Sequence, residues 1–547
     1  MLCLKTKKKK FLCINKNILI SIVYALFITF ILLFMDKLYS VYNHYFIFEY
    51  KSKEFFKLFF LILFISGISR FRIRLFLFFT LTIFSLFQYI HFSYFGKNIA
   101  AIEFYLFFTN INETFETLNN MLSLVFMPLF IVTIGFIGIY IIDKKLKDRI
   151  YTNKYTSKLF ILGLIYLSVK VFYVTNIKTG KLLQRDSKII YPLTNRHSSR
   201  NFYVSINYFL VGILPKKIFG SKSNFKILDK PTLINKDINR TIVLIIGESL
   251  RYDTSSLYNN KLTPNLQKFK EEESNFYYKK VYSGGTMTKV SMSVLINRLK
   301  YPQSLEQITN ENNCIYKLAK ENNIDTYFIT AQKSKHLQMI RDMICPKYID
   351  NLIARDDFSN YIVASGYDQD LETILNKKDI LNKNNLIVLQ QRGSHSPYSL
   401  QYPDNYNLYK PYENTVLYTD EILSNLFKYI QENANQETFV FFVSDHGELL
   451  GENGKRGHGH LHQKVYEVPF MMYTNSKNKN IKKIFDNIHS QYDISNYIIS
   501  LLGYDVDLEL NKDRSIYIMN SDLDGFSGYG HLNIINGVES KIKIDHN

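Results

Sequence analysis

The chain has 547 residues and a formal net charge of +19, and it contains 43 Phe, 41 Tyr and no Trp. A hydrophobic content of 47% excludes a disordered or collagen-like chain. Four cysteines are too few for a disulfide-framework protein, and at most Cys314 and Cys345 could pair in an oxidising compartment. No repeat or basic helix indicates a nucleic-acid partner, and the excess of lysine favours a basic exterior near anionic lipid.

The first third of the chain contains long apolar stretches. Residues 17–35 carry no charge over a length that can cross a bilayer, because about 20 residues at about 1.5 Å each span the hydrocarbon. A cleaved signal peptide is the alternative for this stretch, but its apolar part is long and further apolar stretches follow. These lie at about 55–69, 75–95, 121–142 and 159–175. The sequence therefore predicts a transmembrane domain of five helices over residues 1–176.

The basic residues predict the orientation of these helices. Lys and Arg are concentrated in the N-terminal segment and in residues 70–74 and 143–158, whereas residues 96–120 hold one Lys beside three Glu. Because basic loops stay on the cytoplasmic side, we expect a cytoplasmic N-terminus and an outward-facing loop 96–120. With five spans, everything after about residue 176 lies outside.

Residues 177–238 are expected to link two domains. The segment 201–215 (NFYVSINYFLVGILP) is the part with helical periodicity. It fits an amphipathic helix in the membrane interface and, equally well, an ordinary linker helix that packs on the next domain. Both interpretations place it between the membrane and the rest of the chain.

Residues 239–547 have the pattern of an α/β domain. Short apolar runs alternate with helix-like segments such as 415–431, which predicts a mainly parallel sheet covered on both faces. Ligands in such sheets gather beyond the carboxyl ends of the strands, and the polar motifs of this chain follow the runs there. The four runs are 241–246, 325–330, 385–390 and 438–443.

Two of these strand ends carry the side chains of a divalent-metal site. Glu248 follows the first run, and Asp445 and His446 follow the fourth. Each residue alone is more often a cap or a surface charge, but their joint placement at one sheet edge favours a metal. Mixed oxygen and nitrogen ligands without a thiolate suit Zn²⁺ or Mn²⁺ better than a structural zinc site, which usually prefers Cys.

Two further segments could take part in the chemistry. Residues 283–289 (SGGTMTK) form a glycine loop that opens a helix, where phosphate is favoured and a metal-bound Thr hydroxyl would become a nucleophile. The alternative is a plain Ser/Thr helix cap, and the residues themselves do not choose between Thr286 and Thr288. Residues 457–462 (GHGHLH) could bind a second metal or a phosphate oxygen, or form an exposed loop.

Five motifs together resemble a known family. They are IIGESLRYDTSSLY (245–258), SGGTMTKVS (283–291), RGSHSPY (392–398), YENTVLYTDEIL (412–423) and SDHGELLGENG (444–454). They are similar to those of the membrane-bound phosphoethanolamine transferases of the alkaline phosphatase superfamily, which include lipid A-modifying and mobile colistin-resistance enzymes. This resemblance implies a multi-pass protein of the bacterial inner membrane, with five helices followed by a periplasmic, sulfatase-like α/β domain.

The resemblance also implies roles for the motif residues. The nucleophile, which also contacts the metal, corresponds to Thr288, and the other zinc ligands correspond to Glu248, Asp445 and His446. The expected cofactor is therefore Zn²⁺, with Mn²⁺ the weaker alternative.

Substrate contacts are implied at two further pairs of residues. His395 and His458 match the histidines placed near a second zinc or the substrate phosphate. In the outward loop, Asn110 and Thr114 match an N-x-x-x-T pattern that contacts the lipid headgroup.

The chain departs from the family pattern at several positions. The cysteines that flank the nucleophile loop are replaced by Gly284 and Val294, and Gln390 stands where a His usually precedes G-S-H. Leu118 occupies the place of an acidic residue in the headgroup loop, and Lys289 adjoins the nucleophile where a small residue is common. These departures concern the headgroup contacts and the acceptor. For Cys314 and Cys345, a disulfide and two free thiols both fit.

The implied reaction is ping-pong transfer. Thr288 attacks the phosphorus of phosphatidylethanolamine, diacylglycerol leaves, and the covalent phosphoethanolamine ester passes to a lipid A phosphate or a core-sugar hydroxyl of lipopolysaccharide. The alternatives are a phosphoglycerol transferase of the same superfamily and a catalytically inactive membrane scaffold. A sulfatase is disfavoured, because neither Cys314 nor Cys345 lies in a C-x-P-x-R context. The acceptor, the number of zinc ions and the oligomeric state stay open.

Overall fold

The chain forms two compact units, Met1–Ser221 and Lys222–Asn547. The structure is a computed structural model, and it describes residues 2–5, 11–14, 16–43, 52–95, 98–109, 122–153, 155–173, 197–215, 225–236, 238–258, 262–303, 305–340, 343–378, 380–510, 513–523, 527–535 and 538–545. The division falls at residue 221, and the finer boundaries at residues 176 and 238 stay predictions.

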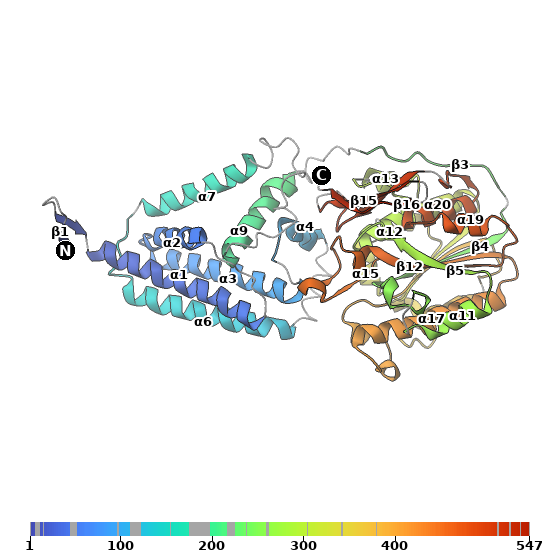
Figure 1. The fold of residues 1–547 in the computed structure, drawn as a ribbon, viewed down its shortest axis with the longest axis horizontal. Helices are drawn as coiled ribbons and strands as arrows, with labels where there is room; N and C mark the ends of the chain where they lie inside the picture. The colour runs from blue at the N-terminus through green and yellow to red at the C-terminus, as the bar shows by residue number, and fades with distance from the viewer. Residues whose placement is uncertain are drawn as a thin grey trace. The chain divides into compact units, whose positions relative to one another are not determined.

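The first unit is a helical bundle that follows a short hairpin, as Figure 1 shows. The hairpin strands are β1 (Leu2–Lys5) and β2 (Phe11–Ile14). The helices are α1 (Lys16–Tyr42), α2 (Ser52–Ser66), α3 (Phe71–Phe95), α4 (Ala101–Thr109), α6 (Leu122–Leu146), α7 (Thr156–Tyr173) and α9 (Ser198–Tyr208), which continues as the π-helix η2 (Phe209–Ile213).

Three of the described helices are long and apolar enough to cross a membrane. They are α1, α3 over Phe71–Ser93 and α6 over Leu124–Leu146. The predicted number of five spans is not confirmed, although α2 and α7 coincide with the other two apolar stretches. The 15 residues of α2 extend about 22 Å at 1.5 Å per residue, which is less than a bilayer's hydrocarbon core.

Helix α9 packs within the first unit. The Asp36 carboxylate of α1 accepts hydrogen bonds from the Ser198 backbone N–H at 3.0 Å and from the Ser198 hydroxyl at 2.5 Å. The Phe202 ring stacks on Phe84 of α3 with ring centroids 4.5 Å apart. One face of the segment 201–215 is therefore buried against α3, and a position of this helix in a membrane interface stays a prediction.

The second unit is built around a seven-stranded sheet. Its strand order is β5-β12-β9-β4-β8-β6-β7. In that order the strands are β5 (Phe276–Tyr282), β12 (Glu467–Thr474), β9 (Glu437–Ser444), β4 (Arg240–Gly247), β8 (Asn385–Gln390), β6 (Asp325–Thr330) and β7 (Asn351–Ala354).

The expectation of a mainly parallel sheet is corrected to a mixed sheet. The four runs identified in the sequence are strands β4, β6, β8 and β9, which pair in parallel with one another. However, β12 pairs antiparallel with both β9 and β5. The chain returns from β9 to β12 through residues 445–466, whose α-helix α18 (Gln463–Tyr466) has four residues. Antiparallel neighbours need no crossover helix, so this strand left no helix–strand alternation in the sequence.

The central strands are apolar on both faces because helices cover both. Along β4, Ile242, Leu244 and Ile246 enter one core cluster, and Val243 and Ile245 enter the other. The first face is covered by α12 (Thr288–Asn297), α14 (Ile315–Glu321), α15 (Ser334–Ile340), α19 (Ile481–Asp486) and α20 (Gln491–Leu501). The second is covered by α11 (Pro264–Glu272), α16 (Asp370–Lys378) and α17 (Pro411–Asn433) (Figure 1).

Smaller elements complete the second unit. A further sheet pairs β14 with β15 and β15 with both β16 and β17. Besides short 3-10 helices, the other described elements are α13 (Leu305–Asn310), β3 (Thr232–Leu233), β13 (Tyr504–Asp505), β10 (Leu449–Leu450), β11 (Arg456–Gly457), β14 (Arg514–Met519), β15 (Tyr529–Ile535), β16 (Val538–Glu539) and β17 (Lys543–Asp545).

Cys314 and Cys345 form a disulfide across 31 residues. Their side chains are buried in the core cluster between the sheet and its first helix layer. Of the two arrangements that fit the sequence, the structure has the disulfide.

We expect replacement of both Cys314 and Cys345 by Ala to lower the free energy of unfolding of the second unit by about 2–4 kcal/mol, because the unfolded chain is then no longer constrained by the cross-link. Thermal unfolding of the full chain in detergent, followed by near-ultraviolet circular dichroism, measures the change. Replacement of Cys3 and Cys13, which belong to the first unit, is the control. An unchanged unfolding transition in the Cys314/Cys345 variant would contradict a stabilising disulfide.

Candidate metal centre

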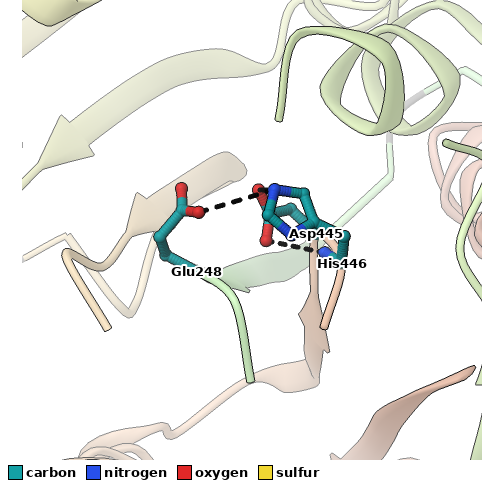
Figure 2. A group of neighbouring side chains, drawn as sticks. All are labelled: Glu248, Asp445 and His446. Atoms are coloured by element: carbon teal, nitrogen blue, oxygen red, sulfur yellow. Dashed lines mark hydrogen bonds and ion pairs between the residues drawn. The ribbon is translucent and has the colours of Figure 1, made fainter. Parts of the chain in front are cut away.

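Two neighbouring strands bring the predicted metal ligands together. Gly247 at the end of β4 is in register with Ser444 at the end of β9, so the residues that follow leave the sheet side by side. Glu248, Asp445 and His446 are buried, and their ligand atoms all lie within 4.8 Å of one another. Figure 2 shows the Glu248 carboxylate and the His446 ring facing each other across this space.

The His446 ring presents a lone pair to the two carboxylates. Its Nδ1 lies 3.0 Å from the Gly447 carbonyl oxygen, and because a carbonyl can only accept, Nδ1 carries the proton. Nε2 is then free of a proton, 3.6 Å from Glu248 Oε1 and 3.3 Å from Asp445 Oδ2. Burial lowers the pKa of His446 to about 3, so the ring stays neutral at physiological pH.

Backbone N–H groups bind one carboxylate oxygen of Asp445, and the other oxygen faces His446. Asp445 Oδ1 accepts hydrogen bonds from the backbone N–H groups of Ser249 at 3.0 Å and His446 at 2.6 Å. Asp445 Oδ2 is buried without a hydrogen-bond partner among the described residues. Burial raises the pKa of Glu248, and the nearby Asp445 charge raises it further.

These groups fit a divalent cation. Two carboxylates and an imidazole nitrogen without a proton converge in a buried space, where their lone pairs repel one another. An ion such as Zn²⁺ would be bound by the free Asp445 Oδ2, a Glu248 oxygen and His446 Nε2, and would replace repulsion by coordination.

The Thr288 hydroxyl lies against this cluster. Thr288 is the first residue of α12, and its Oγ1 lies 3.3 Å from both Glu248 Oε2 and His446 Nε2. Thr286, in contrast, donates its hydroxyl to Asn520 Oδ1 at 2.9 Å and is buried. Of the two threonines that the sequence left open, Thr288 is the one beside the metal ligands.

Two histidines extend the cluster. The His458 ring stacks on His446 with centroids 4.5 Å apart, and the His395 ring lies 6.1 Å from that of His458. His395 Nδ1 is bonded to the Ser396 carbonyl at 2.6 Å, which fixes the ring on the loop after β8. The ends of β4, β8 and β9, the start of α12 and the residue after β11 thus bring together the predicted site residues of the second unit.

Gly393 allows the β8 loop to approach the metal ligands. Its φ is +52°, and a Cβ there would lie 2.7 Å from the Glu248 carbonyl oxygen, closer than any side chain tolerates. In the same place the Ser394 backbone N–H donates to that oxygen at 2.8 Å. The contact holds the loop that carries His395 against the residue that follows β4.

The remaining residues discussed from the sequence are the headgroup contacts and the positions of the family's cysteines. Asn110 and Thr114 lie outside the described residues. Gly284 and Val294, at the places of the family's cysteines, are in direct contact, since a Cβ on Gly284 would lie 2.4 Å from the Val294 side chain. Asn520, which holds Thr286, was not found in the sequence, because it is 234 residues away and no motif surrounds it.

A comparison with known protein families finds a match within the second unit. Residues 240–504 match the family model described as Sulfatase. The matched segment includes β4, β8 and β9 and therefore all the described residues of the cluster, from Glu248 to His458.

Two curated relatives of the chain are named as a phosphoethanolamine transferase and a phosphatidylethanolamine transferase. Phosphoethanolamine transferase EptA from Helicobacter pylori is 27% identical over 427 residues, which cover 72% of this chain and 75% of the relative. Phosphatidylethanolamine transferase Mcr-1 from Escherichia coli is 25% identical over 327 residues, which cover 51% of this chain and 56% of the relative.

A solved structure shares the fold of nearly the whole chain. It is the integral membrane protein lipooligosaccharide phosphoethanolamine transferase A from Neisseria meningitidis, with a TM-score of 0.52 and 15% identity. The match covers 89% of this chain and 95% of that one. The combination of a helical N-terminal unit with an α/β C-terminal unit therefore has a precedent.

We expect metal binding to weaken as the pH falls, with Glu248 as the cause. Because the pKa of this buried carboxyl is raised, the metal-free protein holds a proton there that the metal must displace, whereas His446 is already neutral. Affinity therefore falls as pH falls through the raised pKa of Glu248.

Calorimetric titration of Zn²⁺ at several pH values, in buffers of different protonation enthalpy, counts the protons released. Glu248→Gln should weaken binding by more than about 100-fold and abolish part of this release. Glu437→Gln, at the opposite end of β9, is the matched control and should change neither. A pH-independent affinity without proton release would be incompatible with this cluster as the site.

Gly393→Ala should displace the β8 loop from Glu248, because the added methyl meets backbone atoms at a positive φ. We expect a loss of stability of about 1–3 kcal/mol and a lower activity per folded molecule. Gly451→Ala is the control, since Gly451 also has a positive φ, +136°, but open space around its Cβ position. Equal effects of the two substitutions on activity would show that the contact with Glu248 is unimportant.

Proposed function

We propose that this protein transfers phosphoethanolamine from phosphatidylethanolamine to a cell-envelope lipid, a lipid A phosphate or a core sugar of lipopolysaccharide. The observation that carries the proposal is the Thr288 hydroxyl, 3.3 Å from both Glu248 and His446 in a buried cluster suited to a divalent metal. The two relatives named above, which are phosphoethanolamine and phosphatidylethanolamine transferases, support this choice of substrate.

The proposed metal is Zn²⁺, held by Glu248, Asp445, His446 and Thr288. Its chemistry when bound is that of a Lewis acid that stabilises negative charge on oxygen. A mixed carboxylate and imidazole set without thiolate suits a catalytic rather than a structural zinc, and Mn²⁺ is the weaker candidate. His395 and His458 are proposed to bind a second zinc or the substrate phosphate.

The protein's own residues account for the order of events. The Thr288 hydroxyl donates toward Glu248, which leaves the lone pairs of Oγ1 for the metal and for an approaching phosphorus atom. Thr288 Oγ1 forms the new P–O bond as the bond to the diacylglycerol oxygen breaks, and the Thr288 proton passes to Glu248, which accepts its hydrogen bond. His395 or His458 supplies the proton that diacylglycerol takes. An acceptor oxygen then attacks the phosphothreonine ester and gives its proton to the same histidine, while the proton on Glu248 returns to Thr288 Oγ1.

Both substrates are lipids, which explains the attached helical unit. The three candidate spans of the first unit would hold the chain in the bacterial inner membrane. A cytoplasmic N-terminus, five spans and a periplasmic catalytic domain are the proposed topology. The proposed headgroup contacts are Asn110 and Thr114.

The alternatives receive less support. A phosphoglycerol transferase would use the same cluster, but the relatives named above are phosphoethanolamine and phosphatidylethanolamine transferases. An inactive scaffold would have no need for a complete set of converging ligands beside a nucleophile.

Intact-mass spectrometry of the zinc-loaded protein with phosphatidylethanolamine tests the proposal. We expect a phosphoethanolamine adduct on the wild type and none on Thr288→Ala, because the nucleophilic oxygen is gone. Thr286→Ser, which keeps the hydroxyl bonded to Asn520, is the matched control and should retain the adduct. A parallel sample with phosphatidylglycerol distinguishes the donor. An adduct from phosphatidylglycerol alone, or none from either lipid, would contradict the proposal.

A further inference from the structure

The side chain of Gln491 joins the loop of the metal ligands to the loop of the nucleophile. Gln491 is the first residue of α20, and its side chain is fully buried. We propose that Gln491 is a positioning residue that sets the distance between Thr288 and the metal ligands on β9. This inference rests on the proposed function, in which Thr288 is the nucleophile.

The Gln491 amide makes three hydrogen bonds to backbone groups, and its Oε1 also lies 3.4 Å from the Ser283 hydroxyl. Its Nε2 donates to the Ser444 carbonyl at 2.9 Å and to the Asp445 carbonyl at 2.8 Å. Its Oε1 accepts from the Gly284 backbone N–H at 2.8 Å. One side of the amide thus holds the end of β9 and the other holds the glycine loop.

The two segments that Gln491 joins carry the chemistry. Asp445 is itself a proposed ligand, and Gly284 lies four residues before Thr288. The Ser283 hydroxyl lies between these segments, 2.5 Å from the Gly285 carbonyl and 2.6 Å from the Asp445 carbonyl, and its one proton can be donated to either. A change in the spacing of these backbones would move Thr288 Oγ1 relative to His446, and a displacement of about 1 Å can cost about 100-fold in rate.

The far side of the glycine loop is fixed independently. The Thr286 hydroxyl is bonded to Asn520, and the Thr286 carbonyl accepts from the Gly459 backbone N–H at 2.8 Å. The loop is therefore clamped from the β14 side and from Gln491.

Gln491 itself is held rigidly. A capping box at the start of α20 joins Ser490 and Asp493, and the Asp493 carboxylate accepts from the backbone N–H of Ser490 at 2.9 Å. The preceding residue, His489, accepts from the Tyr282 backbone N–H at 2.8 Å through its carbonyl. The backbone that carries the Gln491 side chain is therefore fixed relative to the end of β5.

Only a neutral amide satisfies these three partners. An ionised glutamate at position 491 would place a second negative oxygen against the two carbonyl oxygens and would lose both donors. Gln491→Glu keeps the size of the side chain and removes the hydrogen bonds that set the spacing.

Gln307 provides a matched control. Its amide is also buried, donates to the carbonyls of Asn297 at 2.8 Å and Arg298 at 2.9 Å, and accepts from the Leu228 backbone N–H at 3.0 Å. The bonding pattern is the same, but Gln307 holds the far end of α12, about 13 Å along the helix from Thr288. Gln307→Glu therefore shows how the loss of such an amide affects stability and rate when the amide is far from the site.

The experiment compares the full-length wild type, Gln491→Glu and Gln307→Glu in detergent. The rate of phosphoethanolamine adduct formation is measured over a range of phosphatidylethanolamine concentrations. The zinc dissociation constant is measured by chelator competition, and the melting temperature by circular dichroism. For Gln491→Glu we expect the maximal rate to fall about 100-fold, with the half-saturating lipid concentration and zinc affinity within about 3-fold of wild type. Gln307→Glu should lower the melting temperature without changing the rate per folded molecule.

A wild-type rate in Gln491→Glu would overturn the positioning role and leave the proposed function intact. A rate loss that follows zinc loss or the folded fraction would also overturn it. If Gln491→Glu does not fold, Gln491→Asn, a neutral amide on a shorter stem, replaces it with the same expected separation of rate from zinc affinity. A zinc-loaded wild type that forms no adduct would overturn both proposals.

Discussion

The C-terminal unit depends on a buried electrostatic conflict at one edge of its sheet. Glu248 and Asp445 place two carboxylates opposite His446 Nε2, which has no proton to share with them, because the ring donates its hydrogen to the Gly447 carbonyl. Burial alone would make this arrangement costly, since it raises the pKa of both carboxyls and lowers that of the imidazole. A divalent cation resolves the conflict, and the surrounding loops are organised to hold the ligands where they are.

The loops achieve this through backbone contacts rather than through further charges. Gly393 brings the β8 loop against Glu248, and the Tyr412 hydroxyl bridges the Ser249 carbonyl and the Arg251 backbone N–H at 2.8 and 3.1 Å. Ser249 has a positive φ of 56°, so this bridge holds the turn that carries Glu248 in a conformation that a serine rarely adopts. The Gln491 side chain makes corresponding hydrogen bonds between the end of β9 and the glycine loop.

The site could be predicted from the sequence to the extent that each part follows an apolar strand. The runs before Glu248, His395 and Asp445 are β4, β8 and β9, and their parallel pairing brings the motifs to one edge. The antiparallel β12 left no alternation of helix and strand to recognise. The choice of Thr288 over Thr286 came in the sequence from family resemblance alone, and in the structure it follows from the hydrogen bond to Asn520.

The residues that could not be predicted from the sequence are those whose side chains hydrogen-bond to backbone groups far away along the chain. Gln491 lies 46 residues beyond Asp445 and 207 beyond Gly284, and a glutamine at a helix start carries no local signal of such contacts. In the first unit, apolarity located the helices, but it could not decide how many cross a membrane, because α2 is short and its length was visible only in the fold.

Zinc-edge X-ray absorption spectroscopy of the zinc-loaded full chain tests the central claim most directly. The cluster predicts about four nitrogen and oxygen ligands near 2.0 Å, with one imidazole and no sulfur in the coordination shell. The Asp445→Asn variant should lose or alter this shell, because Asp445 Oδ2 is the buried oxygen without a hydrogen-bond partner among the described residues. A zinc–sulfur distance, or an unchanged shell in that variant, would show that the metal binds elsewhere and would contradict the account.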